Sequence, residues 1–304
     1  MINRVINEVK KVIVGKDEII ELVLTAILAK GHILMEDIPG VGKTTMALTF
    51  SKAMKLNGKR MQFTSDVMPL DITGFSVYNN KKDSLEYKEG AIMCNMFLAD
   101  EINRTSPKTQ SALLEAMEEG SVTVDGITHN IDKPFVVIAT QNPIDSIGTQ
   151  ELPDSQLDRF MIKLSMGYPS PDSELIMLKG KEELPEIESV ITAENLIELQ
   201  EKVQNIYVDD KIKKYIIKIA NLTRNNEYIK LGLSPRATIA ITSMAKANAF
   251  LENRKYVIPE DVQKVFPYTA GHRIVLQTRA RIEEKSVEKI MNEIIMEVGE
   301  VDLS

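Results

Sequence analysis

The residues best suited to chemistry lie in the segment Glu36-Asp-Ile-Pro-Gly-Val-Gly-Lys-Thr-Thr45, between an apolar run and a helical stretch. Gly40 and Gly42 let backbone N–H groups approach a polyphosphate, and Lys43 can reach its β- and γ-phosphates. The Thr44 hydroxyl can bind Mg²⁺ where the helix begins. The segment therefore predicts a phosphate-binding loop.

This loop departs from the strict pattern G-x-x-x-x-G-K-[ST] at one position, because Asp37 stands where the pattern has its first glycine. Aspartate tolerates turn conformations, and its carboxylate can point away from the phosphates. The alternative is a glycine-rich turn that happens to precede Lys-Thr. The strand–loop–helix context favours the phosphate-binding loop.

A second motif, Asn95-Met-Phe-Leu-Ala-Asp-Glu-Ile-Asn103, reads as a buried strand that ends in two carboxylates. Asp100 would hold Mg²⁺, usually through water, and Glu101 would polarise the water that attacks a γ-phosphate. Alone, such an ending is often a strand that meets solvent. Together with Lys43 it indicates that metal, phosphate clamp and base converge at the carboxyl ends of one parallel sheet.

Two other polar residues have an ordinary and a functional interpretation. Asn142, at the end of a predicted strand in Ala139-Thr-Gln-Asn-Pro143, could donate to a γ-phosphate or to the attacking water, or could simply form an Asn-Pro turn. Arg159 could be a surface salt-bridge partner, which is the commoner fate of arginine. Position alone does not decide between these alternatives.

The remaining reactive side chains receive no role. Cys94 is the one cysteine of the sequence, so an intramolecular disulfide is excluded and a reduced, buried thiol is expected. His32, His129 and His272 lie far apart without a cysteine cluster, so no zinc-ligand spacing exists. We expect each histidine to be structural.

These residues need a sheet to position them, and the first 165 residues alternate short apolar runs with helical stretches. This alternation predicts a parallel sheet covered by helices on both faces. The predicted strands are Ile33–Met35, Arg60–Phe63, Met96–Ala99, Phe135–Ala139 and Ile162–Leu164, with helices over Thr44–Met54 and Lys108–Glu118.

Two β-hairpins interrupt the alternation. One spans about Phe75–Tyr87 with Asn79-Asn80 at its turn, and the other spans about Ser121–Ile131 with Asp125-Gly126 at its turn. After Tyr168-Pro-Ser-Pro-Asp172 the apolar spacing becomes helical, which predicts a second, helical domain. Its clearest helices are Asn195–Ile206, Lys211–Leu222 and Arg236–Leu251.

The composition is that of a globular protein of roughly two domains: 304 residues, 43% apolar and 27% charged, with net charge −7. Residues 1–165 carry −4 and residues 166–304 carry −3, so no basic arm is available for nucleic acid. The apolar stretch Ile19–Ala29 falls well short of the roughly 18–20 residues that cross a bilayer. No secretory signal is visible. We expect a soluble, cytoplasmic protein.

Over nearly its whole length, the sequence resembles MoxR-type AAA+ ATPases. Besides Glu36–Thr44, the resemblance rests on Gln62-Phe-Thr-Ser-Asp66, Asp71-Ile-Thr-Gly74, Leu98-Ala-Asp-Glu-Ile-Asn-Arg104, Pro107-Lys-Thr-Gln-Ser-Ala-Leu-Leu-Glu-Ala-Met-Glu118, Ala139–Pro143, Leu152-Pro-Asp-Ser-Gln-Leu-Asp-Arg-Phe160 and Ser234-Pro-Arg-Ala237. Loops of the form Glu-Asp-x-Pro-Gly are usual in that family, which accounts for Asp37.

The resemblance implies an AAA+ P-loop core over residues 1–168, a linker over 169–190 and a helical lid over 191–304, with ATP and Mg²⁺ as cofactors. Asn142 would be the sensor on the γ-phosphate, Arg159 the arginine finger that enters the neighbouring subunit's site, and Arg236 the lid arginine on bound nucleotide. Arg104 would act across the subunit interface or in a structural salt bridge. The hairpins would be the helix-2 insert and the pre-sensor-1 hairpin. The implied nucleotide contacts are Val14 and Gly15 at the adenine, then Pro39, Gly40, Val41, Gly42, Lys43, Thr44, Thr45 and Arg236.

The function that follows is an ATP-hydrolysing motor, assembled as a hexameric ring because an arginine finger requires a neighbour. The resemblance implies a chaperone-like remodelling of partner complexes, often with a protein that carries a von Willebrand factor A domain. The alternative is a nucleic-acid-directed motor, against which the acidic charge argues. A non-hydrolysing, nucleotide-gated scaffold is disfavoured, since Lys43, Asp100, Glu101 and Asn142 are all present.

Overall fold

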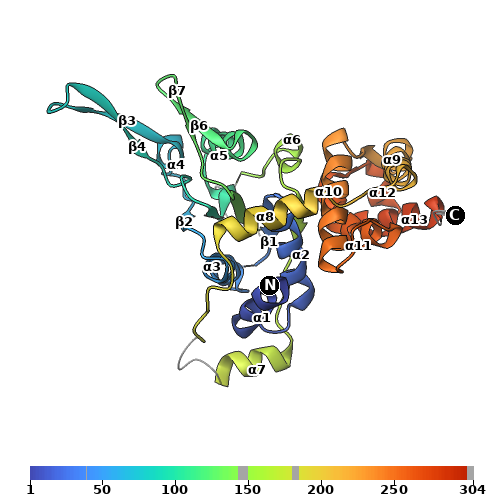
Figure 1. The fold of residues 1–304 in the computed structure, drawn as a ribbon. Helices are drawn as coiled ribbons and strands as arrows, with labels where there is room; N and C mark the ends of the chain where they lie inside the picture. Colours follow the sequence, from blue (N-terminus) through green and yellow to red (C-terminus); the bar gives the residue numbers. More distant parts are fainter. Residues whose placement is uncertain (39, 143–149, 180–184, 300–304) are drawn as a thin grey trace. The chain divides into compact units, whose positions relative to one another are not determined.

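The computed structural model describes residues 1–38, 40–142, 150–179 and 185–299 (Figure 1). The chain divides into two compact units. The first comprises Met1–Glu21, His32–Arg159 and Leu164–Ile197, and the second comprises Leu22–Gly31, Phe160–Lys163 and Glu198–Ser304. Within the described ranges, every helix is too short or too polar to cross a lipid bilayer.

A five-stranded sheet with the order β2-β5-β8-β1-β9 forms the framework of the α/β part. The strands are β1 (Ile33–Glu36), β2 (Gly58–Gln62), β5 (Met96–Asp100), β8 (Val136–Gln141) and β9 (Ile162–Leu164). The pairs β2–β5, β5–β8 and β8–β1 are parallel. Strand β5 is buried at every position, as expected when helices cover both faces of a parallel sheet. The predicted parallel sheet is confirmed, with strand ends that differ by a residue or two.

Helices precede, separate and follow these strands along the chain, and some begin where the sequence supplies start signals. They are α1 (Ile2–Val12), α2 (Asp17–Leu28), α3 (Lys43–Ala53), α4 (Pro69–Thr73), α5 (Pro107–Glu119), α6 (Asp154–Leu157), α7 (Pro171–Lys179), α8 (Ala193–Gln204) and a 3₁₀ turn, Ile102–Arg104. In α5, Pro107 occupies the first turn, and the Ser106 side chain caps the helix by accepting a hydrogen bond from the Thr109 N–H. Gly120, in the left-handed conformation, ends it.

Both predicted hairpins are present, each as a separate two-stranded sheet. Strands β6 (Ser121–Val124) and β7 (Ile127–Asn130) meet at Asp125-Gly126, both with positive φ, as predicted. The first hairpin, β3 (Gly74–Asn79) and β4 (Ser84–Glu89), turns over residues 80–83, so the predicted turn at Asn79-Asn80 is corrected. Asn79 still pairs with Ser84 in the ladder, and its side chain accepts from the Lys81 N–H inside the turn.

The second unit is helical, as predicted. Its helices are α9 (Asp210–Asn225), α10 (Pro235–Leu251), α11 (Pro259–Ala270), α12 (Thr278–Ile282) and α13 (Val287–Val298), with a 3₁₀ turn at Gly271–Arg273. Ser234 caps α10 by accepting from the Ala237 N–H. A short antiparallel pair, β10 (Ile229–Leu231) with β11 (Val275–Leu276), was not predicted, because two or three residues are too few to show a strand period.

Candidate nucleotide site

A pocket of about 310 Å³ lies at the carboxyl ends of the parallel strands. The phosphate-binding loop follows β1, Asp100 ends β5, Asn142 follows β8, and β2 contributes two polar side chains. The lining residues are Gly40, Gly42, Lys43, Thr44, Thr45, Arg60, Gln62, Asp100, Glu101 and Asn142. The structure thus brings together predicted residues from three separate motifs, as the parallel topology requires.

The loop's glycines are needed for their backbone conformation. Gly40 has φ +87° and Gly42 has φ +97°, a region that side chains with a Cβ rarely adopt. Lys43 then begins α3, and its ammonium donates to the Asp37 carbonyl inside the loop. Burial lowers the pKa of Lys43, although Asp37, Asp100 and Glu101 act in the opposite direction. Glu36 acts in that direction too, so four carboxylates lie near Lys43, which is placed to exchange its loop contact for an anionic ligand.

Asp37, the departure from the strict loop pattern, turns its carboxylate toward residues 165–167. It accepts hydrogen bonds from the Ser165 hydroxyl (3.0 Å) and from the N–H groups of Gly167 (2.6 Å) and Ile38 (2.9 Å). Burial raises the pKa of Asp37, but these bonds outweigh it and leave the pKa below its usual value. The carboxylate therefore anchors the loop instead of opposing an anionic ligand.

The Asp100 carboxylate has partners on both oxygens. Oδ1 accepts from the Thr140 hydroxyl (2.6 Å), and Oδ2 accepts from the Thr44 hydroxyl (3.2 Å) and from Arg60 Nη2 (2.8 Å). Burial raises the pKa of Asp100, yet these hydrogen bonds bring it below its usual value. Thr44 and Asp100 present two hard oxygen ligands side by side, which fits Mg²⁺. Arg60 binds the same oxygen that such an ion would use.

Glu101 has the left-handed φ of +57°, which turns its side chain out of the strand direction. Its N–H donates to the Thr140 hydroxyl (2.9 Å). Its Oε2 accepts from Gln62 Nε2 (2.9 Å) and from Arg104 Nη1 (2.7 Å). One threonine hydroxyl therefore positions both Asp100 and Glu101, while two donors hold the Glu101 carboxylate.

Three of these contributors, Thr140, Arg60 and Gln62, were not assigned from the sequence. Thr140 is fully buried two residues before Asn142 in the same block. Arg60 and Gln62 alternate along β2, so both point to one face of the sheet. That alternation of polar side chains was the available signal.

The other predicted residues lie in different places. Asn142 lines the pocket, and its carbonyl accepts from Asn103 Nδ2 (3.1 Å). Arg159 follows α6 and pairs with Glu118 of α5 at 3.3 Å, and it is not among the described residues that line the pocket. Arg236 lies in the first turn of α10, in the second unit. Pro39 lies outside the described residues.

Val14 and Gly15 form the turn between α1 and α2. Gly15 has φ +71°, and a Cβ there would lie 2.4 Å from the Ser173 hydroxyl of α7. The next residue, Lys16, donates to the carbonyls of Met166 and Tyr168. These contacts attach the turn to the segment that also receives Asp37.

Cys94, His32 and His272, which received no role from the sequence, are surrounded by protein, and burial shifts the pKa of each. Burial raises the pKa of Cys94 to about 11, so its thiol stays protonated at neutral pH. His32 accepts at Nδ1 from the Val137 N–H (2.9 Å) and donates from Nε2 to the Met117 carbonyl (3.0 Å); burial lowers its pKa to about 4. Burial likewise lowers the pKa of His272 to about 3. In the described ranges, no three His, Cys, Asp or Glu side chains group as metal ligands.

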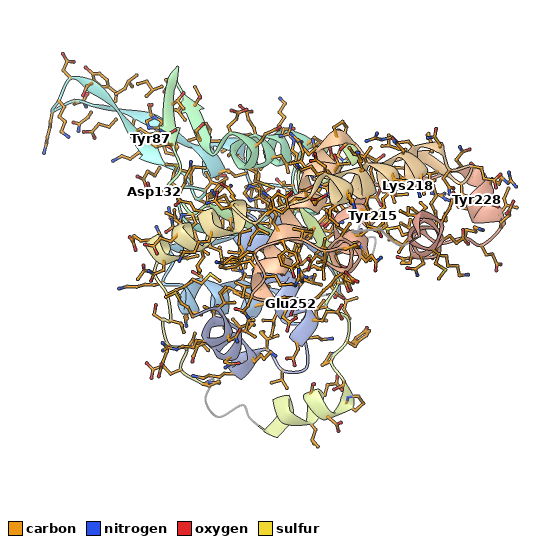
Figure 2. All side chains as sticks on the ribbon, turned by 45° about the vertical axis from the view of Figure 1, so that its right-hand side comes forward. Tyr87, Asp132, Tyr215, Lys218, Tyr228 and Glu252 are labelled. Carbon is orange, nitrogen blue, oxygen red and sulfur yellow. The ribbon has the colours of Figure 1, made fainter. Side chains whose placement is uncertain are left out.

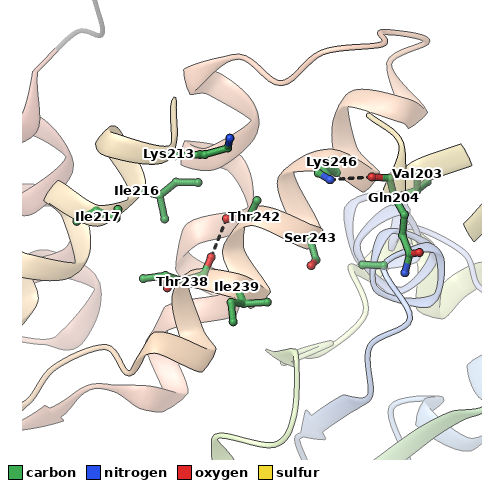
Figure 3. A pocket seen from close by; sticks show the side chains of 11 residues that line it. Val203, Gln204, Lys213, Ile216, Ile217, Thr238, Ile239, Thr242, Ser243 and Lys246 are labelled. Carbon is green, nitrogen blue, oxygen red and sulfur yellow. Dashed lines mark hydrogen bonds between the residues drawn. The ribbon is translucent and has the colours of Figure 1, made fainter. Parts of the chain in front are cut away.

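A second cavity, of about 400 Å³, lies within the second unit (Figure 3). Its walls come mainly from α9 and α10, where isoleucines such as Ile216 and Ile239 stand among threonine, serine and lysine side chains. The Lys246 ammonium at its edge donates to the Gln204 carbonyl. No carboxylate lines this cavity among the described residues, so it lacks the chemistry of the first pocket.

Comparisons with known proteins agree with this geometry. Residues 32–162 match the family described as ATPase family associated with various cellular activities (AAA), and residues 221–294 match the AAA lid domain. The chain is 50% identical to the uncharacterized protein YeaC of Bacillus subtilis, over 98% of this chain and 94% of that protein. It is 38% identical to Chaperone MoxR1 of Mycobacterium tuberculosis, over 98% of this chain and 82% of that protein.

A crystal structure of a candidate ATPase from Cytophaga hutchinsonii superposes with a TM-score of 0.90 at 38% identity, over 97% of this chain and 93% of that one. The fold and the site define an AAA+ nucleotide-hydrolysing core with a lid. The chain belongs to the MoxR family of AAA+ ATPases, enzymes that hydrolyse ATP.

Proposed function

We propose that this ATPase works as a hexameric ring that couples ATP hydrolysis to the remodelling or maturation of a partner protein complex. The observation that carries the proposal is the convergence of Lys43, Thr44, Asp100, Glu101 and Asn142 on one pocket. The name of the relative Chaperone MoxR1 supports a chaperone-like role.

Within the site, the residues divide the work. Lys43 binds the β- and γ-phosphates, and the loop N–H groups from Gly40 to Thr45, Val41 included, surround them. Thr44 and Asp100 hold Mg²⁺, which when bound neutralises charge on the phosphate oxygens. Glu101 orients and polarises the attacking water, and Asn142 donates to the γ-phosphate.

Two regions outside the pocket complete nucleotide binding in this proposal. Val14 and Gly15 line the adenine pocket, in a turn where Gly15 packs closely against Ser173. Arg236 of the lid contacts bound nucleotide within its own subunit. The division into a core at 1–168, a linker at 169–190 and a lid at 191–304 stays a prediction, as does a cytoplasmic location.

Arg159 acts on the neighbouring subunit's nucleotide. Within its own chain Arg159 pairs with Glu118 of α5, and Arg159 is not among the described residues that line the pocket. Mixing Lys43→Ala subunits with Arg159→Ala subunits should restore part of the activity, because some interfaces then pair an intact loop with an intact arginine. Loss of such a finger costs about 10³–10⁵ in rate, so partial rescue is measurable. Absence of rescue in rings that exchange subunits would contradict action in trans.

The partner is the feature to test directly. We propose a protein with a von Willebrand factor A domain as adaptor or client, and the experiment is steady-state ATPase activity with and without such a protein. The chain's net charge of −7 gives DNA little attraction, so activity should change little with single- or double-stranded DNA at physiological salt. Strong, salt-sensitive stimulation by DNA, without a response to any such protein, would favour a nucleic-acid-directed motor.

A further inference from the structure

Asp37 joins the phosphate-binding loop to the segment between β9 and α7, Ser165-Met166-Gly167-Tyr168, which we call the anchor segment. Asp37 is 8% exposed, and its Oδ2 accepts hydrogen bonds from the Ser165 hydroxyl (3.0 Å) and the Gly167 N–H (2.6 Å). Its backbone carbonyl accepts from the Lys43 ammonium. One residue therefore links the lysine of the loop to a segment far along the chain.

The backbone and packing of the anchor segment fit this contact. Gly167 has φ +60°, a conformation that favours glycine, and in it the N–H points at the Asp37 carboxylate. Met166 is buried, and its terminal methyl lies 3.7 Å from the place that a Cβ on Gly42 would occupy. The anchor segment thus contacts the loop by packing as well as by hydrogen bonds.

A second polar contact holds the anchor segment from the turn between α1 and α2. Lys16, which follows Gly15 in that turn, donates to the Met166 carbonyl and to the Tyr168 carbonyl (2.9 Å). Gly15 itself packs against Ser173, near the start of α7. The anchor segment therefore contacts both the loop proposed for the phosphates and the turn proposed for the adenine.

The surroundings of the anchor segment leave it room to shift. The side chains of Ser165 and Tyr168 are exposed, the latter residue to 75%. The α7 helix that follows lies at the margin of the first unit, apart from the central sheet (Figure 1, Figure 2). Much of what holds the segment is therefore its contact with Asp37 and Lys16.

We propose that Asp37 is a positioning residue that couples the phosphate-binding loop to the anchor segment, so that nucleotide in the loop changes the environment of residues 165–168. This inference rests on the proposed phosphate-binding role of the loop and deepens it. Bound phosphates draw the Lys43 ammonium away from the Asp37 carbonyl. Because the carboxylate of the same residue bonds the anchor segment, a change in its backbone is passed on. The glycine of the strict loop pattern has no side chain to make this link.

A carboxylate suits this link because only donors approach it. The Ser165 hydroxyl and the N–H groups of Gly167 and Ile38 all donate to Asp37, and they hold its pKa below the usual value despite burial. An asparagine at this position would present its NH₂ group to at least one of those donors. Asp37→Asn therefore breaks the link while keeping the size of the side chain.

The test uses the full-length protein with Tyr168→Trp as a reporter of the anchor segment. The sequence contains no tryptophan, so the emission comes from this position alone. The Tyr168 side chain is exposed and Lys16 binds the backbone carbonyl, so the substitution keeps that contact. A non-hydrolysable ATP analogue with Mg²⁺ should shift the tryptophan emission. The shift should saturate over the same concentrations as nucleotide binding, measured by the anisotropy of a fluorescent ATP analogue.

Asp37→Asn, added to Tyr168→Trp, should abolish the shift at saturating nucleotide. It should also weaken nucleotide binding by about tenfold, because hydrogen bonds to a charged acceptor are lost from the loop. Glu36→Gln is the matched control, since it removes the adjacent carboxylate, which accepts from Gln141 of β8. It should keep the emission shift.

Ser165→Ala tests the link from its other end, at an exposed side chain. It should reduce the shift and weaken nucleotide binding by about threefold, since one hydrogen bond to Asp37 is lost. Added to Asp37→Asn, it should have no further effect, because the two residues act through the same contact. Thermal unfolding checks that each variant folds, and Ser165→Ala with Glu36→Gln carries the test if Asp37→Asn does not.

Three results would overturn the inference: nucleotide binding by the Tyr168→Trp protein without a change in emission, a full shift in Asp37→Asn, or additive effects of Asp37→Asn and Ser165→Ala. Equal loss of the shift in Glu36→Gln would also overturn it, by assigning the effect to the charge of the loop. Undiminished nucleotide binding by Lys43→Ala would instead count against the proposed phosphate-binding role of the loop.

Discussion

Thr140→Val tests whether one buried hydroxyl positions both Asp100 and Glu101, the two carboxylates of the proposed site. The substitution keeps the size of the side chain and removes two hydrogen bonds, one to Asp100 (2.6 Å) and one from the Glu101 N–H (2.9 Å). A bond to a charged group contributes about 1.5–3 kcal/mol and a neutral one about 1 kcal/mol. Thr140 is fully buried, so water does not replace the hydroxyl. The two losses together amount to about 3 kcal/mol.

If these two hydrogen bonds stabilise the transition state more than the bound substrate, their loss lowers kcat for ATP hydrolysis about 100-fold. ATP affinity should change much less, because in the proposed mechanism Lys43 and the loop bind the phosphates in the ground state. Thr140→Ser is the matched control, since it keeps the hydroxyl. The assay combines steady-state ATPase kinetics, binding of a fluorescent ATP analogue and thermal unfolding.

A large fall in kcat with little change in ATP affinity would show that Thr140 positions the two carboxylates, whereas general destabilisation of the site would reduce both. Near-normal hydrolysis by Thr140→Val would refute the reasoning. So would equal impairment of Thr140→Val and Thr140→Ser, because the hydroxyl would then not be the group that matters. A loss of ATP affinity as large as the loss of kcat would assign Thr140 to loop structure instead.

Two further predictions concern a buried ring and the metal site. Burial holds the pKa of His32 at about 4, against about 6.5 in the unfolded chain, so the stability from its neutral form is complete above pH 6.5 and is lost as the pH falls toward 4. Allowing for its partial exposure, His32 should make unfolding at pH 5 cost about 1–2 kcal/mol less than at pH 7. His272 acts in the same direction, so His32→Gln should reduce the pH dependence in thermal melts without abolishing it. If the stability of His32→Gln depended on pH as strongly as that of the wild type, this role of His32 would be contradicted. Arg60→Met should lower the Mg²⁺ concentration needed for nucleotide binding by about tenfold, because the half-exposed Arg60 guanidinium, 2.8 Å from the buried Asp100 carboxylate, no longer competes with the ion. Arg60→Lys keeps the charge and should behave like the wild type in a fluorescent-nucleotide titration, and equal Mg²⁺ requirements in all three proteins would reject the competition.

Local motifs were predictable from the sequence, whereas contacts between strands were not. Lys43 and Thr44 follow a strand and begin a helix, so their chemistry depends on a few neighbouring residues. The contacts of Arg60 with Asp100 and of Gln62 with Glu101 depend on β2 lying beside β5, with Gln62 opposite Asp100. Periodicity indicates strands but does not give their order. The motifs are therefore visible in the sequence, whereas Arg60 and Gln62, which hold their carboxylates, are identified by the strand order.

Three other features depend on how strands pair, how the hairpins pack or whether a neighbouring subunit is present, and the sequence pattern does not give these. The turn at residues 80–83 was misplaced because Asn79-Asn80 looks like a two-residue turn, while the ladder continues to Ser84. The stack of Tyr87 on His129 joins two hairpins whose strands show no shared pattern in the sequence. The proposed action of Arg159 on another subunit depends on a neighbouring copy, whereas within its own chain the described ion pair of Arg159 is with Glu118.

The central claim is that Lys43 binds the nucleotide while Glu101 drives its hydrolysis. The most direct measurement compares Glu101→Gln with Lys43→Ala, by nucleotide binding and by single-turnover hydrolysis of bound ATP. We expect Glu101→Gln to retain ATP with near-normal affinity and to hydrolyse almost none of it, and Lys43→Ala to bind ATP weakly. Near-normal hydrolysis by Glu101→Gln, or undiminished ATP binding by Lys43→Ala, would contradict it.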